Sequence, residues 1–545
     1  MASQHEKGAA SPPAGLPCSP TASSFSHEKG PEPVTQSVTA SSAAGSDSGH
    51  TAQTHTSLKK VITTRQFVPM ALGGSIGAGL LIASSVGLER GGPASLVLAF
   101  AIAGFAVWLT MCALGELSAS FPVSGSFYDY SIRFISPSWG FSMGWNYVIN
   151  FLLIVPFEIT VMILITKYWY SPNTGWFVPV VIAALFGIAA AGAKWYAEAE
   201  HAFGLAKVGV ILLFIITAIV ICAGGVASDP RQGTGFRYWR EGAFQNGIQG
   251  FLWVFVNAGL AYGGTEMLGL TVAECKNPVR VMPLASKIVG GRILILYVLS
   301  LFMAGLVIGP DTFKEFSHLG KTSPFVLAIH QARIPGLASF VNAVILISVF
   351  SMANASIFAS SRALRAICAQ GMGPRFLSRT TKKKGIPLYS LMVVFAVSLL
   401  AFINAAPSGG EIFEWLLALA SASNYFTWLS ICLAHLRMRG AMKKQGKELS
   451  ELTWRSPVGT WGSVVAIVIF AFALVSQIVT AVIPPVPNED ESHAESIFRG
   501  ILGFLVVIGA WIGHLVITRS KLLIPLEEAD LTMNSDVPDT RPAEP

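Results

Sequence analysis

The chain has 545 residues, of which 52% are hydrophobic and only 12% are charged. Soluble domains carry about 25% charged residues, so this composition excludes an ordinary soluble protein and indicates a membrane protein. The net charge of +7 does not indicate a nucleic-acid partner. The basic residues lie in short segments between apolar runs, as the cytoplasmic face of a membrane protein requires.

Polar tails flank the apolar part of the chain. Residues 1–60 are rich in Ser, Thr, Ala, Gly and Pro, so they are expected to form a disordered cytoplasmic tail. This tail is a natural target for kinases, and Lys59 and Lys60 are natural targets for a ubiquitin ligase. Residues 61–522 form the predicted membrane domain, and residues 523–545 form a short cytoplasmic C-terminal tail.

Twelve apolar runs are each long enough to cross about 30 Å of hydrocarbon, which predicts an all-α protein of the lipid bilayer. An even number of spans returns the C-terminus to the side of the N-terminus. The basic segments 375–384 and 437–447 then both lie in the cytoplasm. The runs lie near residues 66–88, 94–120, 140–169, 175–193, 204–226, 246–273, 287–310, 337–369, 387–405, 411–436, 459–484 and 499–518.

Glycine clusters interrupt the first and the sixth of these runs, at 73–79 and at 263–264. Each glycine weakens a helix by roughly 1 kcal/mol relative to alanine. Glycine-interrupted spans at matching places in two halves indicate an inverted-repeat transporter whose site lies at the breaks. Close helix packing is the alternative explanation of such glycines. The matched pair of clusters, with Glu266 beside one of them, favours a site.

A helix that breaks inside the membrane exposes N–H groups at one new end and carbonyl groups at the other. We expect a zwitterionic substrate to place its carboxylate on the N–H groups of residues 77–79. Its ammonium group would lie on the carbonyls of residues 260–262. The predicted substrate-binding residues are Ser75, Ile76, Gly77, Ala78, Gly79, Leu260, Ala261, Tyr262, Gly263 and Gly264.

Charged residues inside the spans are costly and are usually functional. Glu158, in the third span, is predicted to line the substrate path or to pair with a basic residue. Glu266 either takes up a proton during transport or braces the interrupted sixth span. Asn354, in the eighth span, is a weaker candidate, because small polar groups between helices often serve packing.

Several ordered motifs resemble those of the amino acid–polyamine–organocation superfamily, and specifically those of its fungal-type amino-acid permease family. The resemblance covers residues 66–522. It is carried by the glycine cluster at 73–79 and by Gly91–Leu96, Ala113–Leu117, Phe121–Phe127, Gly144–Tyr147, Pro156–Glu158, Gly264–Glu266, Ala359–Arg362 and Ile431–His435.

This resemblance implies twelve transmembrane helices, arranged as two inverted five-helix repeats with discontinuous helices 1 and 6, plus two extra helices. It also implies amino-acid uptake across the plasma membrane, driven by protons. Lys207 resembles a lysine that replaces the sodium ion of sodium-coupled relatives, which makes it a coupling candidate with Glu266 and Asn354. The alternative is a lysine that extends to the cytoplasmic interface. Leu260 replaces a usual aromatic residue and Gly263 a frequent Gln, so the amino-acid preference does not carry over.

Two other functions stay open from the sequence. The same fold also suits a polyamine or a betaine, and a permease-like sensor binds its solute without accumulating it. The sequence has no nucleophile–base pair, no phosphate-binding loop and no cluster of metal ligands. We therefore expect neither an enzyme nor a primary pump, and no cofactor or metal.

Overall fold

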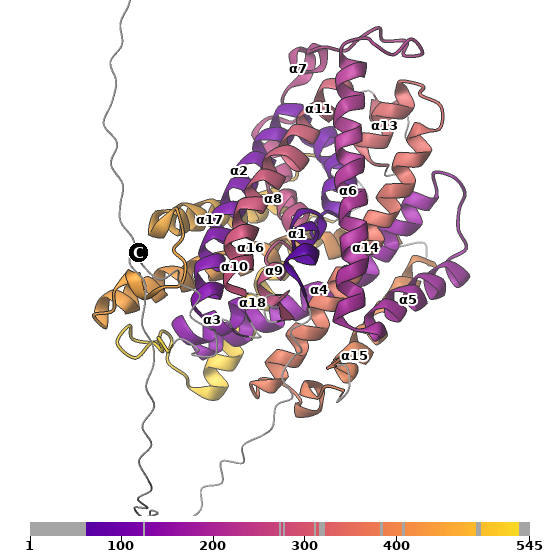
Figure 1. Ribbon diagram of the computed structural model, residues 1–545. Helices are drawn as coiled ribbons and strands as arrows, with labels where there is room; N and C mark the ends of the chain where they lie inside the picture. Colours follow the sequence, from indigo (N-terminus) through magenta and orange to yellow (C-terminus); the bar gives the residue numbers. More distant parts are fainter. Residues whose placement is uncertain are drawn as a thin grey trace, which may run out of the picture. The chain divides into compact units, whose positions relative to one another are not determined.

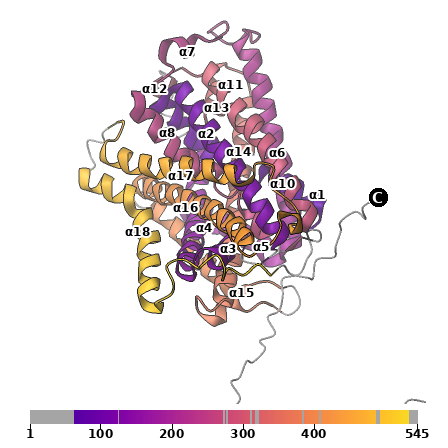
Figure 2. The same cartoon turned by 90° about the vertical axis from the view of Figure 1, so that its left-hand side faces the viewer.

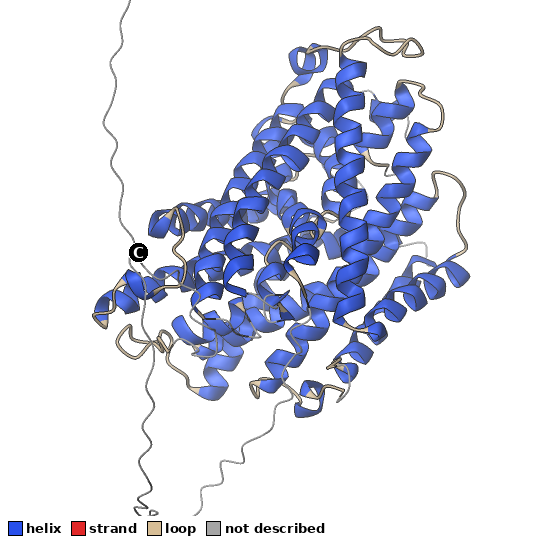
Figure 3. Cartoon of the chain, viewed as in Figure 1, coloured by secondary structure: helices blue, strands red, loops and turns tan. Residues whose placement is uncertain are grey.

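The structure is a computed structural model. It describes residues 62–532 except 122, 124–125, 272–273, 276–277, 310–311, 316–321, 382–384, 406–408 and 487–491. The predicted N-terminal tail, residues 1–60, lies outside the described residues. In the described part of the chain there are helices and loops but no strand (Figure 3).

The helices in chain order are α1 (Thr64–Gly73), η1 (Gly79–Ala83), α2 (Ser84–Ser120), α3 (Phe127–Phe134), α4 (Pro137–Thr166), α5 (Thr174–Ala191), α6 (Ala193–Cys222), α7 (Arg237–Gly242), α8 (Gly247–Tyr262), α9 (Met267–Thr271), α10 (Pro278–Arg292), η3 (Ile293–Leu299), α11 (Ser300–Val307), α12 (Thr312–Glu315), α13 (Pro324–Gln331), α14 (Leu337–Ala369), η5 (Arg375–Ser378), α15 (Leu388–Ser398), η6 (Leu399–Ala405), α16 (Gly409–Lys444), η7 (Leu449–Glu451), α17 (Gly459–Val482) and α18 (His493–Thr518).

Eight helical stretches within the described residues are long and apolar enough to cross a membrane. They are Gly79–Ser120, Pro137–Thr166, Thr174–Ala191, Ala193–Cys222, Val281–Val307, Leu337–Ala369, Gly459–Val482 and His493–Thr518. Large apolar side chains on the outside of the helices fit a lipid environment, because soluble monomers rarely expose extended apolar surface. Trp461 is 77% exposed and Ile517 is 84% exposed.

Four expected spans, the first, sixth, ninth and tenth, correspond to other helices of the structure. The first is divided between α1 and η1, and the sixth between α8 and α9. The stretch Gly79–Ser120 contains a turn at Gly92, whose φ of 81° favours glycine, so it holds parts of two expected spans. The ninth corresponds to the shorter apolar helix Leu388–Ile403, and α16 contains the tenth.

Two helix pairs form the centre of the packing. Helix α4 lies along α14, and α2 lies along α8 (Figures 1 and 2). Helix α1 crosses α6 where glycine faces glycine, and a Cβ atom added to Gly73 would lie 2.6 Å from the Cα atom of Gly204. Side chains larger than hydrogen are therefore excluded from this crossing, which brings the end of α1 against Lys207 on α6.

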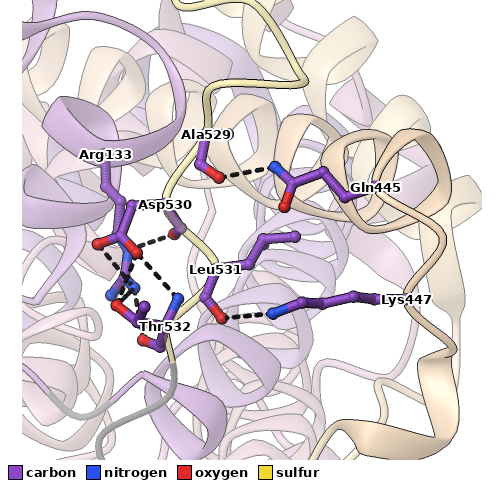
Figure 4. Close-up of polar contacts among 7 residues, drawn as sticks. All are labelled: Arg133, Gln445, Lys447, Ala529, Asp530, Leu531 and Thr532. Carbon is purple, nitrogen blue, oxygen red and sulfur yellow. Dashed lines mark hydrogen bonds and ion pairs between the residues drawn. The ribbon is translucent and has the colours of Figure 1, made fainter.

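The chain after α18 folds back onto the helices. We call residues 519–532 the C-terminal strap. Arg133 on α3 holds one side of the strap, with bonds to the Asp530 carbonyl at 2.6 Å and to the Asp530 carboxylate at 3.0 Å (Figure 4). Gln445 and Lys447, just after α16, hold the other side through the carbonyls of Ala529 and Leu531, at 2.8 and 3.1 Å (Figure 4).

The strap is also anchored by an apolar side chain and by a charge. Leu531 is buried, with an exposed fraction of 4%. Partial burial alone would raise the pKa of Asp530, but hydrogen bonds from Thr532 and the charge of Arg133 outweigh it and hold this pKa below its usual value. The folded strap therefore favours the charged form of the Asp530 carboxylate. Residues 523–532 of the predicted C-terminal tail thus pack against the helical domain.

Truncation of the chain after Leu523 is expected to lower the thermal unfolding midpoint of the purified protein by several degrees. It removes the partners of Arg133, Gln445 and Lys447, and an ordinary hydrogen bond contributes about 0.5–1.5 kcal/mol. Truncation after Thr532 is the matched control and should leave the midpoint unchanged. Because the folded pKa of Asp530 is lowered, its contribution is present at neutral pH and is lost below about pH 4. Equal midpoints for the two truncated chains would contradict this role of the strap.

Candidate functional site

The two helix interruptions lie next to each other in the protein interior. Residues 74–77 separate α1 from the following helical turn, and residues 263–266 separate α8 from α9. A Cβ atom added to Gly79 would lie 2.5 Å from the Cα atom of Ala261, so the two backbones touch. The Ser75 and Thr265 hydroxyls, one from each interruption, lie 3.4 Å apart. The structure therefore brings the predicted glycine clusters together at one place.

The carbonyls that end α8 already have donors within the chain. The Ala261 carbonyl accepts a hydrogen bond from the Tyr297 hydroxyl at 3.1 Å. The Tyr262 carbonyl accepts one from the Thr265 hydroxyl at 2.7 Å, and the Leu260 carbonyl one from the Gly263 N–H at 3.2 Å. Because each carbonyl oxygen has a second lone pair, a ligand ammonium group at this helix end either shares a carbonyl with its internal donor or replaces that donor. The Tyr297 hydroxyl is the one that comes from a neighbouring helical segment.

The N–H end of the first interruption carries a carboxylate from α4. The Glu158 carboxylate lies close to the Ala78 N–H, and its Oε1 atom would be 3.1 Å from a Cβ atom on Gly77. The other oxygen, Oε2, is buried and has no hydrogen-bond partner among the described residues. Glu158 thus occupies the position that helix geometry makes suitable for an anion.

A lysine cluster lies at the C-terminal end of α1. Lys207 is fully buried and donates a hydrogen bond to the Gly73 carbonyl at 3.0 Å. The charges of Glu200 and Glu158 both act on this lysine. Ser351 and Asn354 of α14 hold Glu200, with Asn354 Nδ2 3.1 Å from Glu200 Oε1. Lys207 is therefore enclosed by the protein and does not extend to the surface, although the alternative interpretation requires this. Asn354 is linked to it through Glu200.

A second buried cation, Arg292 at the end of α10, joins the two interruptions. Its guanidinium donates to the Ala71 carbonyl of α1 at 2.9 Å and to the Thr265 hydroxyl at 2.7 Å. The side chain is buried, with an exposed fraction of 2%, and its Nε has no hydrogen-bond partner within the described part of the chain. A single planar group with several donors suits this double contact better than an ammonium group does.

Glu266 braces the second interruption. One carboxylate oxygen accepts the Gly264 N–H at 3.2 Å, and the other accepts the Trp428 indole N–H at 2.9 Å. Both oxygens therefore hold the backbone at the break or a side chain of α16. Tyr262 is also engaged, because its hydroxyl donates to the Phe100 carbonyl at 2.8 Å and its ring stacks on Tyr297.

The sequence analysis did not identify Arg292, Tyr297, Trp428 or Glu200 as parts of this site. The sequence could have indicated Glu200, because it precedes Lys207 by seven residues and therefore lies on the same face of the helix. Arg292 had a weaker signal, as a charge inside the seventh apolar run. Nothing in the sequence indicated Tyr297 or Trp428, because their contacts depend on how distant helices pack.

Replacement of Arg292 by Met is expected to lower the thermal unfolding midpoint of the purified protein. It leaves the Ala71 carbonyl without this donor and removes one partner of the Thr265 hydroxyl, and a buried unsatisfied group costs about 1–3 kcal/mol. Arg292→Lys should give an intermediate midpoint, because one ammonium group cannot reproduce the planar double contact. Arg375→Met, at an exposed position, is the control and should behave as the unaltered chain. A midpoint for Arg292→Met equal to that of the control would contradict the proposed link between the interruptions.

Comparison with known proteins identifies the family. Residues 66–524 match the model of the amino acid permease family. The chain is 37% identical over 482 residues to amino acid transporter 1 of Schizosaccharomyces pombe, covering 87% of this chain and 82% of that protein. It is 37% identical over 490 residues to cationic amino acid transporter 1 of the same organism (88% and 82% covered). It is 39% identical over 463 residues to the amino-acid permease inda1 of Hypocrea atroviridis (84% and 81% covered). With its apolar helices and its two adjacent interruptions, the chain belongs to the amino acid permease family and is a multi-pass transporter of amino acids rather than an enzyme.

Proposed function

We propose that this permease is a proton-coupled amino-acid symporter of the plasma membrane with both termini in the cytoplasm. We further propose twelve spans, built as two inverted five-helix repeats plus two extra helices. The paired interruptions support the repeat, since η1 and α8, which belong to the first spans of the two halves, touch at Gly79 and Ala261. The third spans of the two halves, α4 and α14, also pack along each other.

The observation that carries the proposal is the contact between Glu158 and the Ala78 N–H. This N–H is part of the helix end where an amino-acid carboxylate is expected. Binding of substrate there would displace Glu158. A buried carboxylate that loses its donor is costly to keep charged, so a proton would bind to Glu158 as the substrate carboxylate takes its place. Substrate and proton would then enter the site together.

The balance of buried charges supports one proton in each cycle. Around the two interruptions, the described buried residues include three acids (Glu158, Glu200 and Glu266) and two bases (Lys207 and Arg292). An amino-acid zwitterion adds no net charge. One proton therefore neutralises the single acid in excess, which reduces the cost of holding these groups away from water.

In this mechanism, the hydrogen bond of Lys207 would depend on the position of α1. It bonds the Gly73 carbonyl at 3.0 Å, which is one of the carbonyls left free where α1 ends. Movement of α1 would break this bond and return Lys207 to Glu200 and Glu158. Asn354 would assist by keeping Glu200 in position, and Glu266 would keep the second interruption in shape.

Uptake by the purified full-length protein in liposomes tests the proposal. A panel of labelled amino acids is supplied with and without an inward proton gradient. We expect one or a few amino acids to accumulate, and only with the gradient. If the amino acid only equilibrates across the membrane, to the same level with and without the gradient, proton coupling is overturned. Saturable binding of an amino acid without uptake would favour a sensor. Uptake of a polyamine or betaine, but of no amino acid, would show that amino acids are not the substrate.

Glu158→Gln separates coupling from binding in the same liposomes. The amide keeps the size of the side chain beside the Ala78 N–H but takes up no proton. Exchange of internal for external amino acid should therefore continue while gradient-driven accumulation stops. Glu274→Gln, at an acid of the separate Glu274–Arg362 ion pair, serves for comparison and should not selectively abolish accumulation. Gradient-driven accumulation by the Glu158→Gln protein would refute the assigned role of Glu158.

Lys207→Met is expected to reduce the uptake rate at least about tenfold, which corresponds to about 1.4 kcal/mol. The change removes the donor to the Gly73 carbonyl and leaves Glu200 buried without its opposing charge, at a cost of about 1–3 kcal/mol or more. Lys194→Met is the matched control, because Lys194 lies on the same helix but is exposed. Equal initial rates for the two variants would show that the Lys207 contact has no part in transport.

A further inference from the structure

A groove of about 590 Å³ opens between α2 and the α10–η3 segment. Ala101, Phe105 and Trp108 of α2 form one wall, and Ile293 and Leu294 belong to the other. The groove is as large as a typical small-molecule pocket, which measures about 300–1,000 Å³. None of the described residues that line it is acidic. Its size and its apolar walls suit a hydrocarbon chain.

The groove opens toward the lipid. Phe105 is 48% exposed and Leu294 is 65% exposed. These residues lie in Gly79–Ser120 and Val281–Val307, which are both long and apolar enough to cross a membrane. Lipid chains are therefore the molecules that reach the groove at this position.

A free positive charge marks the same groove. Lys287 of α10 lines it and is exposed, and no described residue forms an ion pair or hydrogen bond with its ammonium group. A charge within a span is costly unless it extends to the interface or meets an opposite charge. Trp454, from the segment between α16 and α17, lines the groove as well and is of a type enriched at membrane interfaces.

The proposed topology gives the side of the membrane. With the N-terminus inside, α10 enters the membrane from the cytoplasm, and the segment that contains Trp454 is cytoplasmic. Anionic phospholipids are concentrated in the cytoplasmic leaflet, and each basic residue near the membrane surface attracts them by about 1 kcal/mol. The charge of Lys287 and the apolar walls thus complement the two parts of such a lipid.

We propose that the groove binds one anionic phospholipid of the cytoplasmic leaflet, with its phosphate at Lys287 and one acyl chain along α2. This assignment rests on the topology given under the proposed function. It adds a lipid ligand to the amino acid and the proton.

The lipid would lie next to the end of α8, which is part of the proposed substrate site. Gly104 and Ile293 line the inner wall of the groove. A Cβ atom on Gly104 would lie 2.5 Å from the Ile293 Cγ2 atom and 2.6 Å from the Tyr262 hydroxyl. One layer of side chains therefore separates the groove from the end of α8. A lipid that fills the groove would keep α2 and α10 in place around Tyr262.

Photolabelling of the full-length protein in liposomes tests the site. Phosphatidylserine and phosphatidylcholine probes with the same diazirine-bearing acyl chain are compared, and labelled peptides are mapped by mass spectrometry. We expect residues 101–112 and 286–298 to be labelled about fivefold more by phosphatidylserine, the ratio that about 1 kcal/mol gives. Lys287→Gln should remove this preference, and Lys287→Arg should keep it. Lys443→Gln, at an exposed lysine of α16, is the control and should keep it as well.

A second variant tests the groove independently of the charge. Ala101→Phe fills the groove, so labelling of these peptides by both probes should fall while Lys287 is retained. Equal labelling by the two probes, a preference that survives Lys287→Gln, or labelling confined to other helices would each overturn the proposal. The readout is binding of lipid, so failure of amino-acid transport in the same liposomes would count against the proposed function and not against this site.

Discussion

Backbone groups released by the two helix interruptions must be satisfied without water, and the rest of the centre is arranged around this requirement. Non-helical backbone is tolerated at this depth only where the protein itself supplies partners or encloses a cavity. Here Lys207 and Arg292 take the carbonyls of Gly73 and Ala71, at 3.0 and 2.9 Å. Glu158 lies beside the Ala78 N–H. Cations therefore meet the carbonyl end of α1, and a carboxylate meets the N–H end of the next helical segment, as the direction of the helix dipole favours.

The same arrangement explains why charged side chains are found deep in an apolar protein. Each of them is matched to a backbone group or to an opposite charge, so the cost of burial is divided among several contacts. The contacts also connect separate helices, since Arg292 reaches both α1 and the segment between α8 and α9. A change in one contact is therefore transmitted to the others, which is the property that a coupled transporter needs.

Sequence patterns predicted the helical class, the two glycine-rich interruptions and the burial of Glu158 and Glu266, because hydropathy and glycine content act over short distances. They did not predict which donor meets which acceptor. The Tyr297 hydroxyl reaches Ala261 from 36 residues away, and the Trp428 indole reaches Glu266 from 162 residues away. Such pairs depend on the crossing of helices, as at Gly73 and Gly204. The change of helix type from α15 to η6 within the ninth run was not predicted either, because hydropathy does not depend on helix type.

The C-terminal strap has a consequence for the order in which the molecule is completed. Arg133 is synthesised early, whereas its partner Asp530 is among the last described residues of the chain. During synthesis, α3 and the end of α16 therefore remain without these partners until the segment after α18 has left the ribosome. A messenger RNA with a stop codon shortly after α18 would yield a chain with every helix of the described residues but without these contacts. The strap thus distinguishes a chain that continues past α18 from one that stops there.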